Sequence, residues 1–439
     1  MKNLSTFILF AAGLVVFSCA LNNNSNNTTN NDDSINIVNV TPQALLSPYG
    51  GDNSSAIKTA AVGANDFAFR LGAELLKGNG GKNFVFSPYS VWLPLAALVN
   101  ATAPQYQGEL FTALGAAGIA QDDINKAASR MLYDLTNVRD QGEEGYYNPL
   151  KIANAIFVGK DVTLRRDFAQ TYMDFYRGSS INVDFSSPSA ADAVNRWASK
   201  NTEGLIDNLI QEFDPDTVAA IANAIYFSDR WSWEFSPQKT EEDVFHGPSG
   251  DTRAFYMLRQ GRNQTYYEDE QVQALPLAFK HYAGMYIILP KTGGADELLS
   301  AMTADYFIEI QRNSYLAEGK LLLPRFSIEN DIKGLMESLK ELGVPLFAGE
   351  PITGLIEEPI PLVATDAMQR ALIKVDEKGT TAAAVTVIQM GATSTGPGEE
   401  PPPQPLFEMI CDKPFAFILY DNTYDGGRQI LFTGIVNQP

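Results

Sequence analysis

The segment KVDEKGTTAAAVTVIQMGATS, Lys374 to Ser394, decides how the rest of this 439-residue chain is interpreted. It begins as an apolar strand that closes near Val375, and Gly379 then lets the backbone turn where other residues would resist. Small residues follow, and Val385 to Ile388 favour extended structure. The glycines and prolines of GATSTGPGEEPPPQP, Gly391 to Pro405, are typical of an exposed loop. The sequence predicts a strand, a hinge and a loop, although a plain connection after an edge strand is the alternative.

Composition indicates one large domain. Hydrophobic residues make up 45% of the chain, enough for a sizeable core, and no shift in composition divides the sequence after about Ala60. The formal net charge is −20, and no basic cluster interrupts it. Because nonspecific nucleic-acid binding needs a basic surface, no nucleic-acid partner is expected, and the acidity is interpreted as solubility.

The N-terminal residues 1–18 are predicted to be a removed secretory signal. Lys2 precedes an apolar run from Phe7 to Phe17, which is too short to span a bilayer as a mature helix. Cys19 follows in a setting that resembles a bacterial lipobox, with Phe17 a less usual residue in it; an ordinary signal peptide with a spare cysteine is the alternative. Residues 19–60 then form a lipid-anchored, asparagine-rich tether. We expect an exported cell-envelope lipoprotein that meets the membrane only through this anchor, or otherwise a secreted protein.

Catalysis by the chain itself is not expected. The two histidines, His246 and His281, do not have metal-ligand spacing. The sequence has no G-x-S-x-G elbow, P-loop or paired Cys-x2-Cys motif, and nothing distinguishes two carboxylates as a glycosidase pair. With Cys19 acylated, Cys411 has no disulfide partner and is interpreted as an inert core thiol. No cofactor and no metal are expected.

Local patterns predict an α+β chain with antiparallel sheets. Asn65 or Asp66 can cap a first helix, and the apolar run Val91 to Val99 predicts a buried one. Asp331 can cap another helix, which Gly343 ends. The predicted strands are Leu150 to Phe157, Thr217 to Phe227, Val272 to Phe279, Met285 to Leu289, Gly319 to Phe326, Ala367 to Asp376, Phe415 to Tyr420 and Gln429 to Val436.

Six segments in order resemble blocks of the serpin family, and the resemblance covers about Asp66 to Pro439. They are NFVFSPYSV (Asn83 to Val91), VNRWASKNTEGLI (Val194 to Ile206), NAIYFSDRWSWEF (Asn223 to Phe235), LLLPRFSI (Leu321 to Ile328), the hinge VDEKGTTAAA and MICDKPFAFIL (Met409 to Leu419). The resemblance implies a domain over residues 61–439 with about nine helices, three β-sheets including a large central one, and an exposed reactive-centre loop at about residues 377–408.

The resemblance implies a protease inhibitor that acts as a suicide substrate. A serine protease attacks the loop and forms a covalent acyl complex, and the cleaved loop inserts as a strand into the central sheet. A cysteine protease is an alternative partner, and a monomer is expected. A non-inhibitory serpin and a surface-exposed binding lipoprotein are the alternative functions.

The hinge has the composition that insertion requires. Its residues, taken from the family pattern, are Glu377, Lys378, Gly379, Thr380, Thr381, Ala382, Ala383 and Ala384. Taking Thr380 as the first inward-facing residue, the period of two in a strand puts Ala382 and Ala384 on the buried face with it and Thr381 and Ala383 on the outer face. No proline or charge interrupts either set after Gly379.

Counting along the family pattern from Glu377 places the reactive bond at Thr393-Ser394. The loop is longer than usual in the family, so Ala392-Thr393 and Met390-Gly391 remain alternatives. No Lys or Arg occurs between Gly379 and Cys411. A small residue before the bond is therefore expected to suit an elastase-like or subtilisin-like protease.

The family also implies a set of residues that controls how the sheet opens. By match of motif these are Ser87, Ser90, Asn223, Gln369, Trp231 and Arg325, the last as a partner for Glu377. The family usually has a histidine where this chain has Gln369; glutamine forms hydrogen bonds but does not titrate near neutrality. The alternative for each is an ordinary core polar group or a surface ion pair.

Overall fold

The structure is a computed structural model that describes residues 9–19, 55–136, 140–142, 145–147, 149–281, 283–332, 334–379, 405–424 and 427–439. Within these residues there are nine α-helices and three β-sheets, so the expected α+β class is confirmed. The helices are α1 (Ser55–Leu76), α2 (Pro88–Leu98), α3 (Pro104–Ala113), α4 (Gln121–Thr136), α5 (Arg166–Tyr176), α6 (Ser189–Asn201), α7 (Ala295–Ala301), α8 (Ala304–Arg312) and α9 (Leu335–Glu341).

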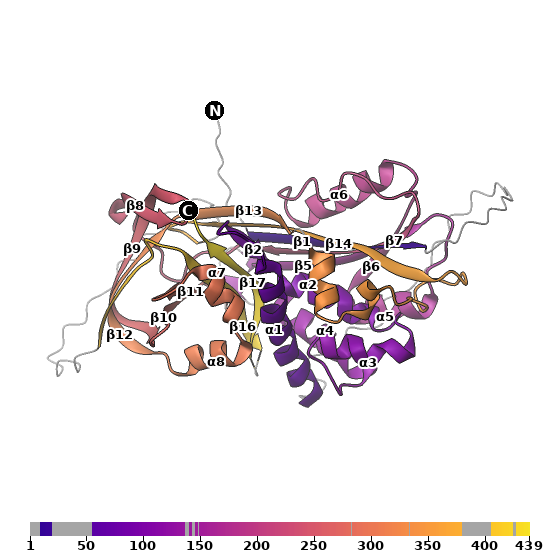
Figure 1. Cartoon of the computed structure of the whole chain (residues 1–439), viewed down its shortest axis with the longest axis horizontal. Helices are drawn as coiled ribbons and strands as arrows, with labels where there is room; N and C mark the ends of the chain where they lie inside the picture. The colour runs from indigo at the N-terminus through magenta and orange to yellow at the C-terminus, as the bar shows by residue number, and fades with distance from the viewer. Residues whose placement is uncertain are drawn as a thin grey trace.

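A six-stranded sheet crosses the molecule between two layers of helices (Figure 1). Its strands, in spatial order, are β13 (Phe326–Ile332), β14 (Leu362–Val375), β1 (Leu9–Cys19), β7 (Thr217–Phe227), β5 (Leu150–Gly159) and β6 (Gly178–Val183). Helix α6 covers one face, and α2, α4 and α5 lie on the other (Figure 1). Strand β7 is therefore enclosed on both sides, which explains its nearly continuous apolar sequence.

A second sheet of nine strands forms the other end of the molecule. Its path is β15 (Leu406–Ile410), β12 (Tyr315–Pro324), β9 (Gly250–Glu268), β10 (Val272–Ala278), β11 (Ala283–Pro290), β16 (Phe415–Tyr424), β17 (Gly427–Val436) and β2 (Phe84–Phe86), with β8 (Glu241–Gly247) paired to β9. A small ladder joins β3 (Asp140–Gly142) and β4 (Gly145–Tyr147).

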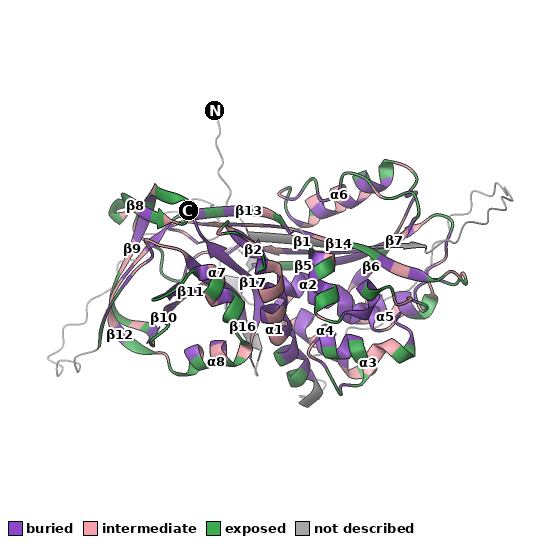
Figure 2. Ribbon diagram, in the orientation of Figure 1, coloured by how far each residue is buried: buried purple, intermediate pink, exposed green. Residues whose placement is uncertain are grey.

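Helix α2 forms where the sequence predicts a buried helix. The Ser87 hydroxyl caps it by accepting a hydrogen bond from the Ser90 amide, and Pro88 occupies the first helical position, where its missing N–H costs nothing. Every residue of α2 is buried, as Figure 2 shows for the helix beneath the sheet. The cap therefore fixes Ser87 and Ser90 directly beneath the six-stranded sheet.

Three details of the expected fold are wrong. Asp331 does not cap a helix, because β13 continues through it and Arg370 of β14 pairs opposite; α9 begins only after Gly334. Asn65 and Asp66 lie inside α1, which begins at Ser55, within the range expected for the tether. The pairs β5–β6 and β12–β15 are parallel, whereas only antiparallel pairing was expected.

The N-terminal segment Leu9–Cys19 is the least expected element of the sheet. It pairs antiparallel with β14 on one side and with β7 on the other, so β7 and β14 do not pair with each other. The sequence predicts that this run is part of a leader, and nothing local in it predicts pairing with strands that begin at Thr217 and Leu362.

Candidate functional site

The position between β7 and β14 runs the full length of the sheet. At one end, near Phe227 and Val375, β14 leaves the sheet and leads to the hinge; we call this end the hinge end. Halfway along, Asn223 of β7 and Gln369 of β14 both lie opposite Gly13 of β1. Two groups of side chains therefore border the position, one at its hinge end and one at its centre.

The hinge itself is a tight turn that needs glycine. Gly379 has φ +134°, and its backbone pairs with that of Arg230 in an isolated β-bridge. A Cβ at Gly379 would lie 2.4 Å from the Asp229 carbonyl oxygen, which is closer than real Cβ contacts. Glycine is thus required both for the backbone conformation and for the close approach. The turn reverses the chain, which leaves Gly379 directed back along β14.

An ion pair with Arg325 holds Glu377, two residues before Gly379. The Arg325 Nε donates to both carboxylate oxygens of Glu377 at 2.9 Å, and the Thr240 hydroxyl donates to the same carboxylate. The Glu377 side chain is 7% exposed, and that of Arg325 is 44% exposed. Burial acts to raise the pKa of Glu377, but the hydrogen bonds from Arg325 and Thr240 outweigh it and lower the pKa below its usual range. The ion pair expected from the sequence is present, with an ionised Glu377.

Trp231 completes the hinge end. Its ring is fully buried and stacks on Phe279, with ring centroids 4.2 Å apart. Its indole Nε1 donates to the Asp376 carbonyl at 2.9 Å, and its backbone N donates to the Lys378 carbonyl at 2.9 Å. We call Glu377, Arg325, Trp231 and Gly379 the hinge anchor, since together they fix the chain where it leaves β14.

Sequence reasoning missed a buried pair behind the hinge anchor. The Nδ1 of His281 lies 2.8 Å from Oδ1 of Asp229, and the His281 amide donates to Oδ2 at 2.9 Å. Burial raises the pKa of the Asp229 carboxyl, although the hydrogen bonds from His281 act against it. His281 is thus the partner of Asp229, and this contact positions the backbone at Asp229 and Arg230, against which Gly379 packs.

The centre of the position is lined by neutral polar groups. The Ser87 amide donates to Gln369 Oε1 and the Gln369 Nε2 donates to the Ser87 carbonyl, both at 2.9 Å. The Ser90 hydroxyl donates to Asn223 Oδ1. All four residues are buried, and they connect α2 to β14 through one pair and to β7 through the other. We call Ser87, Ser90, Asn223 and Gln369 the central cluster.

The structure extends this cluster beyond the residues that the family pattern implies. The Asn223 Nδ2 donates to Asn154 Oδ1 at 2.7 Å, and the Asn154 Nδ2 donates to the Tyr176 carbonyl at 2.7 Å. Asn154 and Asn223 are direct partners in the ladder between β5 and β7. The signal for this pair was available, because each asparagine interrupts a run of apolar residues, Ile152 to Val158 in β5 and Val218 to Ile225 in β7.

Some of the expected site residues lie outside the described part of the chain. These are Thr380, Thr381, Ala382, Ala383 and Ala384 of the hinge and Thr393 and Ser394 of the reactive bond. Lys378 is described, and its backbone N donates to the Asp376 side chain at 2.8 Å. Cys19 is the last residue of β1.

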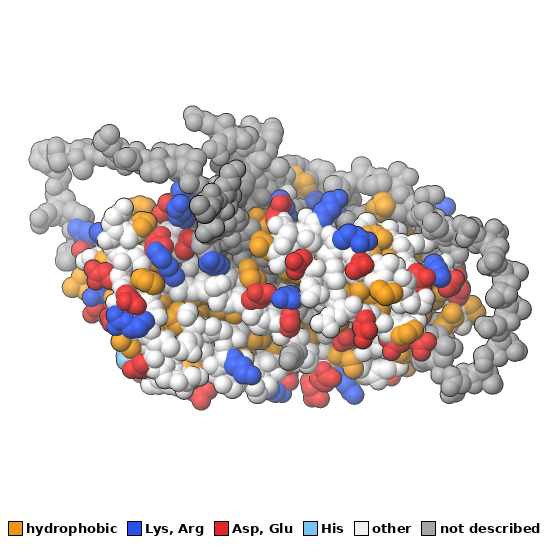
Figure 3. Space-filling view, turned by 90° about the horizontal axis from the view of Figure 1, so that it is seen from above, with side chains coloured by type: hydrophobic (Ala, Val, Ile, Leu, Met, Phe, Trp, Pro, Cys, Tyr) orange, Lys and Arg blue, Asp and Glu red, His pale blue; other side chains and the backbone are white. Residues whose placement is uncertain are grey.

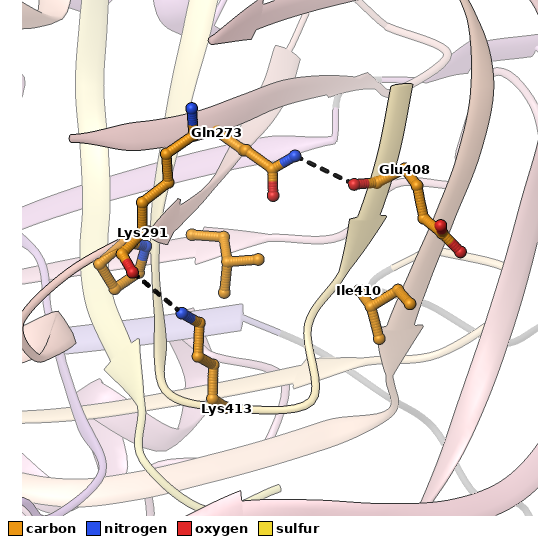
Figure 4. A pocket seen from close by; sticks show the side chains of 7 residues that line it. Gln273, Lys291, Glu408, Ile410 and Lys413 are labelled. Atoms are coloured by element: carbon orange, nitrogen blue, oxygen red, sulfur yellow. Dashed lines mark hydrogen bonds between the residues drawn. The ribbon is translucent and has the colours of Figure 1, made fainter. Parts of the chain in front are cut away.

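A hollow of about 370 Å³ lies beside β15, which carries the chain back into the fold after the loop (Figure 4). Two lysines line it, but both are engaged. The Nζ of Lys291 lies 2.6 Å from Oε1 of Glu268, and the Lys413 ammonium donates a hydrogen bond to the Lys291 carbonyl at 3.4 Å. The hollow therefore has no free cation aimed into it among the described residues.

Two further observations concern metal-ligating side chains and the remaining cysteine. No group of three metal-ligating side chains occurs in them. Burial raises the pKa of the Cys411 thiol strongly, as befits an unreactive core cysteine. On the face shown in Figure 3, acidic and basic side chains are interspersed rather than gathered into a patch of one sign.

A family model described as serpin (serine protease inhibitor) matches residues 62–439. An uncharacterised serpin-like protein of Thermococcus kodakarensis is 31% identical over 85% of this chain and 84% of its own. Mouse alpha-1-antitrypsin 1-4 is 27% identical, covering 88% of this chain and 91% of the relative.

Solved structures share the same fold. The thermophilic serpin tengpin in its native state aligns with a TM-score of 0.72 at 24% identity, over 91% of this chain and 98% of tengpin. Human thyroxine-binding globulin, crystallised with its hormone, has the same TM-score and identity over 88% of this chain and 100% of its own. At this level of identity the likeness concerns the fold alone.

Proposed function

Because the chain belongs to the serpin family, we propose that it inhibits serine proteases as a suicide substrate. The protease contributes the nucleophile, and this chain contributes the loop that is attacked and the position in the sheet that receives it. The chain is not itself an enzyme in this proposal. It acts as a monomer on one protease at a time.

The covalent step takes place on the loop. The serine oxygen of the protease attacks the carbonyl carbon of Thr393, the amide bond to Ser394 breaks, and Ser394 leaves as a free amine after taking up a proton. An ester then joins the protease to Thr393. The segment from Thr380 onward can now enter the sheet and carry the protease with it before water hydrolyses the ester.

One observation carries the proposal: the position between β7 and β14 accepts an antiparallel strand of eleven residues. A chain that leaves β14 and turns at Gly379 must run antiparallel to β14, so the loop has the polarity that this position takes. About ten new ladder hydrogen bonds at roughly 0.5–1.5 kcal/mol each would favour insertion by about 5–15 kcal/mol. That gain is large enough to make trapping irreversible.

The composition of the loop suggests the class of protease. Thr393 follows Ala392, and no Lys or Arg occurs between Gly379 and Cys411. A shallow specificity pocket accepts such residues, whereas a trypsin-like pocket requires a cation. We therefore expect elastase-like or subtilisin-like serine proteases as targets, with a cysteine protease as the alternative.

The test is to mix a chain of residues 20–439, which lacks β1, with an elastase and to separate the products in SDS. A band at the summed mass of both proteins that survives SDS supports trapping, and a protease with a chemically blocked serine is the control that must give no such band. Cleaved chain alone, with the protease fully active, would contradict the proposal.

A non-inhibitory binding protein is the second candidate, and one observation favours it. With β1 in place, the position that the loop must enter is already filled. A non-inhibitory chain would be cleaved in the loop without trapping the protease even when residues 1–19 are absent, so the same experiment distinguishes the two candidates.

The proposed location is the cell envelope, through lipid at Cys19. In the described ranges, no helix has both the length and the apolar character needed to cross a bilayer. The Cys19→Ala variant is expected to leave the membrane fraction, because it lacks the residue that would carry the lipid. Retention of that variant in the membrane fraction would contradict the lipid anchor.

A further inference from the structure

The strand β1 occupies the whole position between its neighbours. Its residues from Phe10 to Cys19 pair with β14, and those from Leu9 to Ser18 pair with β7 (Figure 1). Each ladder is antiparallel, with one irregularity near Phe17. A strand flanked on both sides has its backbone donors and acceptors satisfied within the sheet, so β1 closes the edges of both neighbours.

The same position suits the residues that come after the hinge. Strand β1 starts opposite Phe227 of β7, the end at which Gly379 meets Arg230, and it runs away from the hinge. A segment that continues from Gly379 would start at the same end and run in the same direction. Thr380 to Met390 has the same number of residues as β1, which has eleven. The two segments therefore compete for one position, and only one of them fits at a time.

The sequence of β1 is compatible with stable occupancy. LFAAGLVVFSC contains no charge and no proline, and Leu14 to Phe17 consists of residues that favour strands. Its single glycine, Gly13, is the residue that lies opposite Asn223 and Gln369 of the central cluster. Gly13, the residue of β1 without a side chain, thus lies where buried polar residues flank the strand on both sides.

We propose that Leu9–Cys19 is a built-in occupant that blocks insertion of the cleaved loop. The chain traps protease only after this strand has left the sheet or has been removed. The effect on trapping rests on the proposed function, whereas the pairing of β1 between β7 and β14 does not depend on that function. Cleavage before Cys19 would separate Leu9–Ser18 from the rest of the chain, so N-terminal processing would switch the inhibitor on.

The experiment uses the full, unprocessed chain of residues 1–439. The variant Leu14→Pro with Val16→Pro removes two backbone donors from the middle of β1, which a strand with neighbours on both sides does not tolerate. The matched control, Asn24→Pro with Asn26→Pro, introduces two prolines at the same spacing after the strand. Amide hydrogen exchange over residues 10–18, the melting temperature before and after cleavage of the loop, and the yield of covalent complex are measured for all three proteins.

In the unprocessed wild type and the control, we expect amide exchange over residues 10–18 to be slowed by roughly a hundredfold or more. Cleavage of the loop should leave their melting temperature unchanged, and they should form no covalent complex. In the Leu14→Pro, Val16→Pro variant, the protection should be lost, cleavage should raise the melting temperature by about 10 °C or more, and the complex should form.

Two results would overturn the inference. One is exchange over residues 10–18 that is as fast in wild type as in the variant, and the other is formation of the covalent complex by both proteins in equal yield. If the protection is lost in the variant and yet no complex forms with any protease of the expected class, the proposed inhibitory function fails while the occupancy by β1 stands.

Discussion

The hinge end and the centre of the position between β7 and β14 hold the sheet by different chemistry. At the hinge end, a carboxylate that is 7% exposed pairs with a guanidinium, beside a buried tryptophan. At the centre, the polar groups are serine hydroxyls, amide side chains and backbone, all uncharged and all buried. The hinge anchor fixes the turn at which the chain leaves β14, whereas the central cluster ties two strands to one helix.

This difference separates the region that is sensitive to charge from the region that is not. The free energy contributed by the hinge anchor depends on pH through Glu377, because a paired carboxylate loses its partner when it is protonated. The central cluster contains Gln369 where the family usually has a titratable histidine, so its hydrogen bonds persist across the neutral range. The two regions can therefore be perturbed independently.

The largest effect is expected just beyond the hinge anchor, at Thr380. Thr380→Arg would place a guanidinium with no partner on the buried face at the start of insertion, at a cost of several kcal/mol. Acylation should be unaffected, so the number of inhibitor molecules consumed per protease inactivated should rise about tenfold or more. The matched control is Thr381→Arg, whose side chain is expected to face outward, and both are measured in a chain without residues 1–18. Equal values for the two variants would contradict insertion through this hinge.

The next effect concerns the ion pair itself. Arg325→Met leaves the buried carboxylate of Glu377 with Thr240 as its remaining side-chain partner. We expect the free energy of unfolding to fall by about 2–3 kcal/mol, a value reduced because Arg325 is 44% exposed. Urea unfolding measures this free energy. Arg325→Lys keeps the charge but not the bidentate geometry, so its free energy of unfolding should lie between those of wild type and Arg325→Met. A loss within about 0.5 kcal/mol would show that the pair contributes nothing measurable.

The central cluster should respond by a similar but smaller amount. Asn223→Ala leaves the Ser90 hydroxyl and the Asn154 side chain without their partner in a buried site, at a cost of about 2 kcal/mol. Asn201→Ala is the control, because that side chain makes one local hydrogen bond to the Trp197 carbonyl and should cost about 0.5 kcal/mol. If the two variants unfold at the same urea concentration, the buried network does not hold the sheet together.

The smallest effect is the pH dependence of the hinge anchor. The pKa of Glu377 is lowered in the folded chain, so its contribution is present above the unfolded value of about 4.3 and is lost as pH falls through the lower, folded value. Wild type should exceed Glu377→Gln in unfolding free energy by about 1 kcal/mol at pH 7. The difference should begin to shrink as pH falls below about 4.3 and should disappear below the folded pKa, as measured by urea unfolding across the acidic range. A difference that is constant down to pH 3 would contradict an ionised, paired Glu377.

Much of the fold follows from sequence because its elements have strong local signals. Strand β7 has the boundaries predicted from its apolar run, and α2 forms where the sequence predicts a buried helix. The false helix start at Asp331 has a physical cause. Arg370 of β14 pairs with both Glu329 and Asp331, and such cross-strand ion pairs favour extended structure that helical spacing does not reveal.

The site was predicted where one motif determines it and was missed where two distant segments meet. The pair of Arg325 and Glu377 is present as the family pattern implies. The pair of His281 and Asp229 is not visible in the sequence, because its members lie 52 residues apart and His281 belongs to no motif. The role of β1 was missed for the same reason, since an apolar leader and an apolar strand have the same composition.

The proposed function depends above all on the residues after Gly379 entering the position between β7 and β14 when the loop is cut. The most direct measurement is amide hydrogen exchange over residues 380–390 in a chain of residues 20–439, before and after it captures an elastase. We expect rapid exchange in the intact chain and exchange slowed by roughly a hundredfold or more in the covalent complex, because those amides then bond within the sheet. Rapid exchange that persists in the complex would contradict insertion, and the chain would then inhibit by blocking the protease cleft.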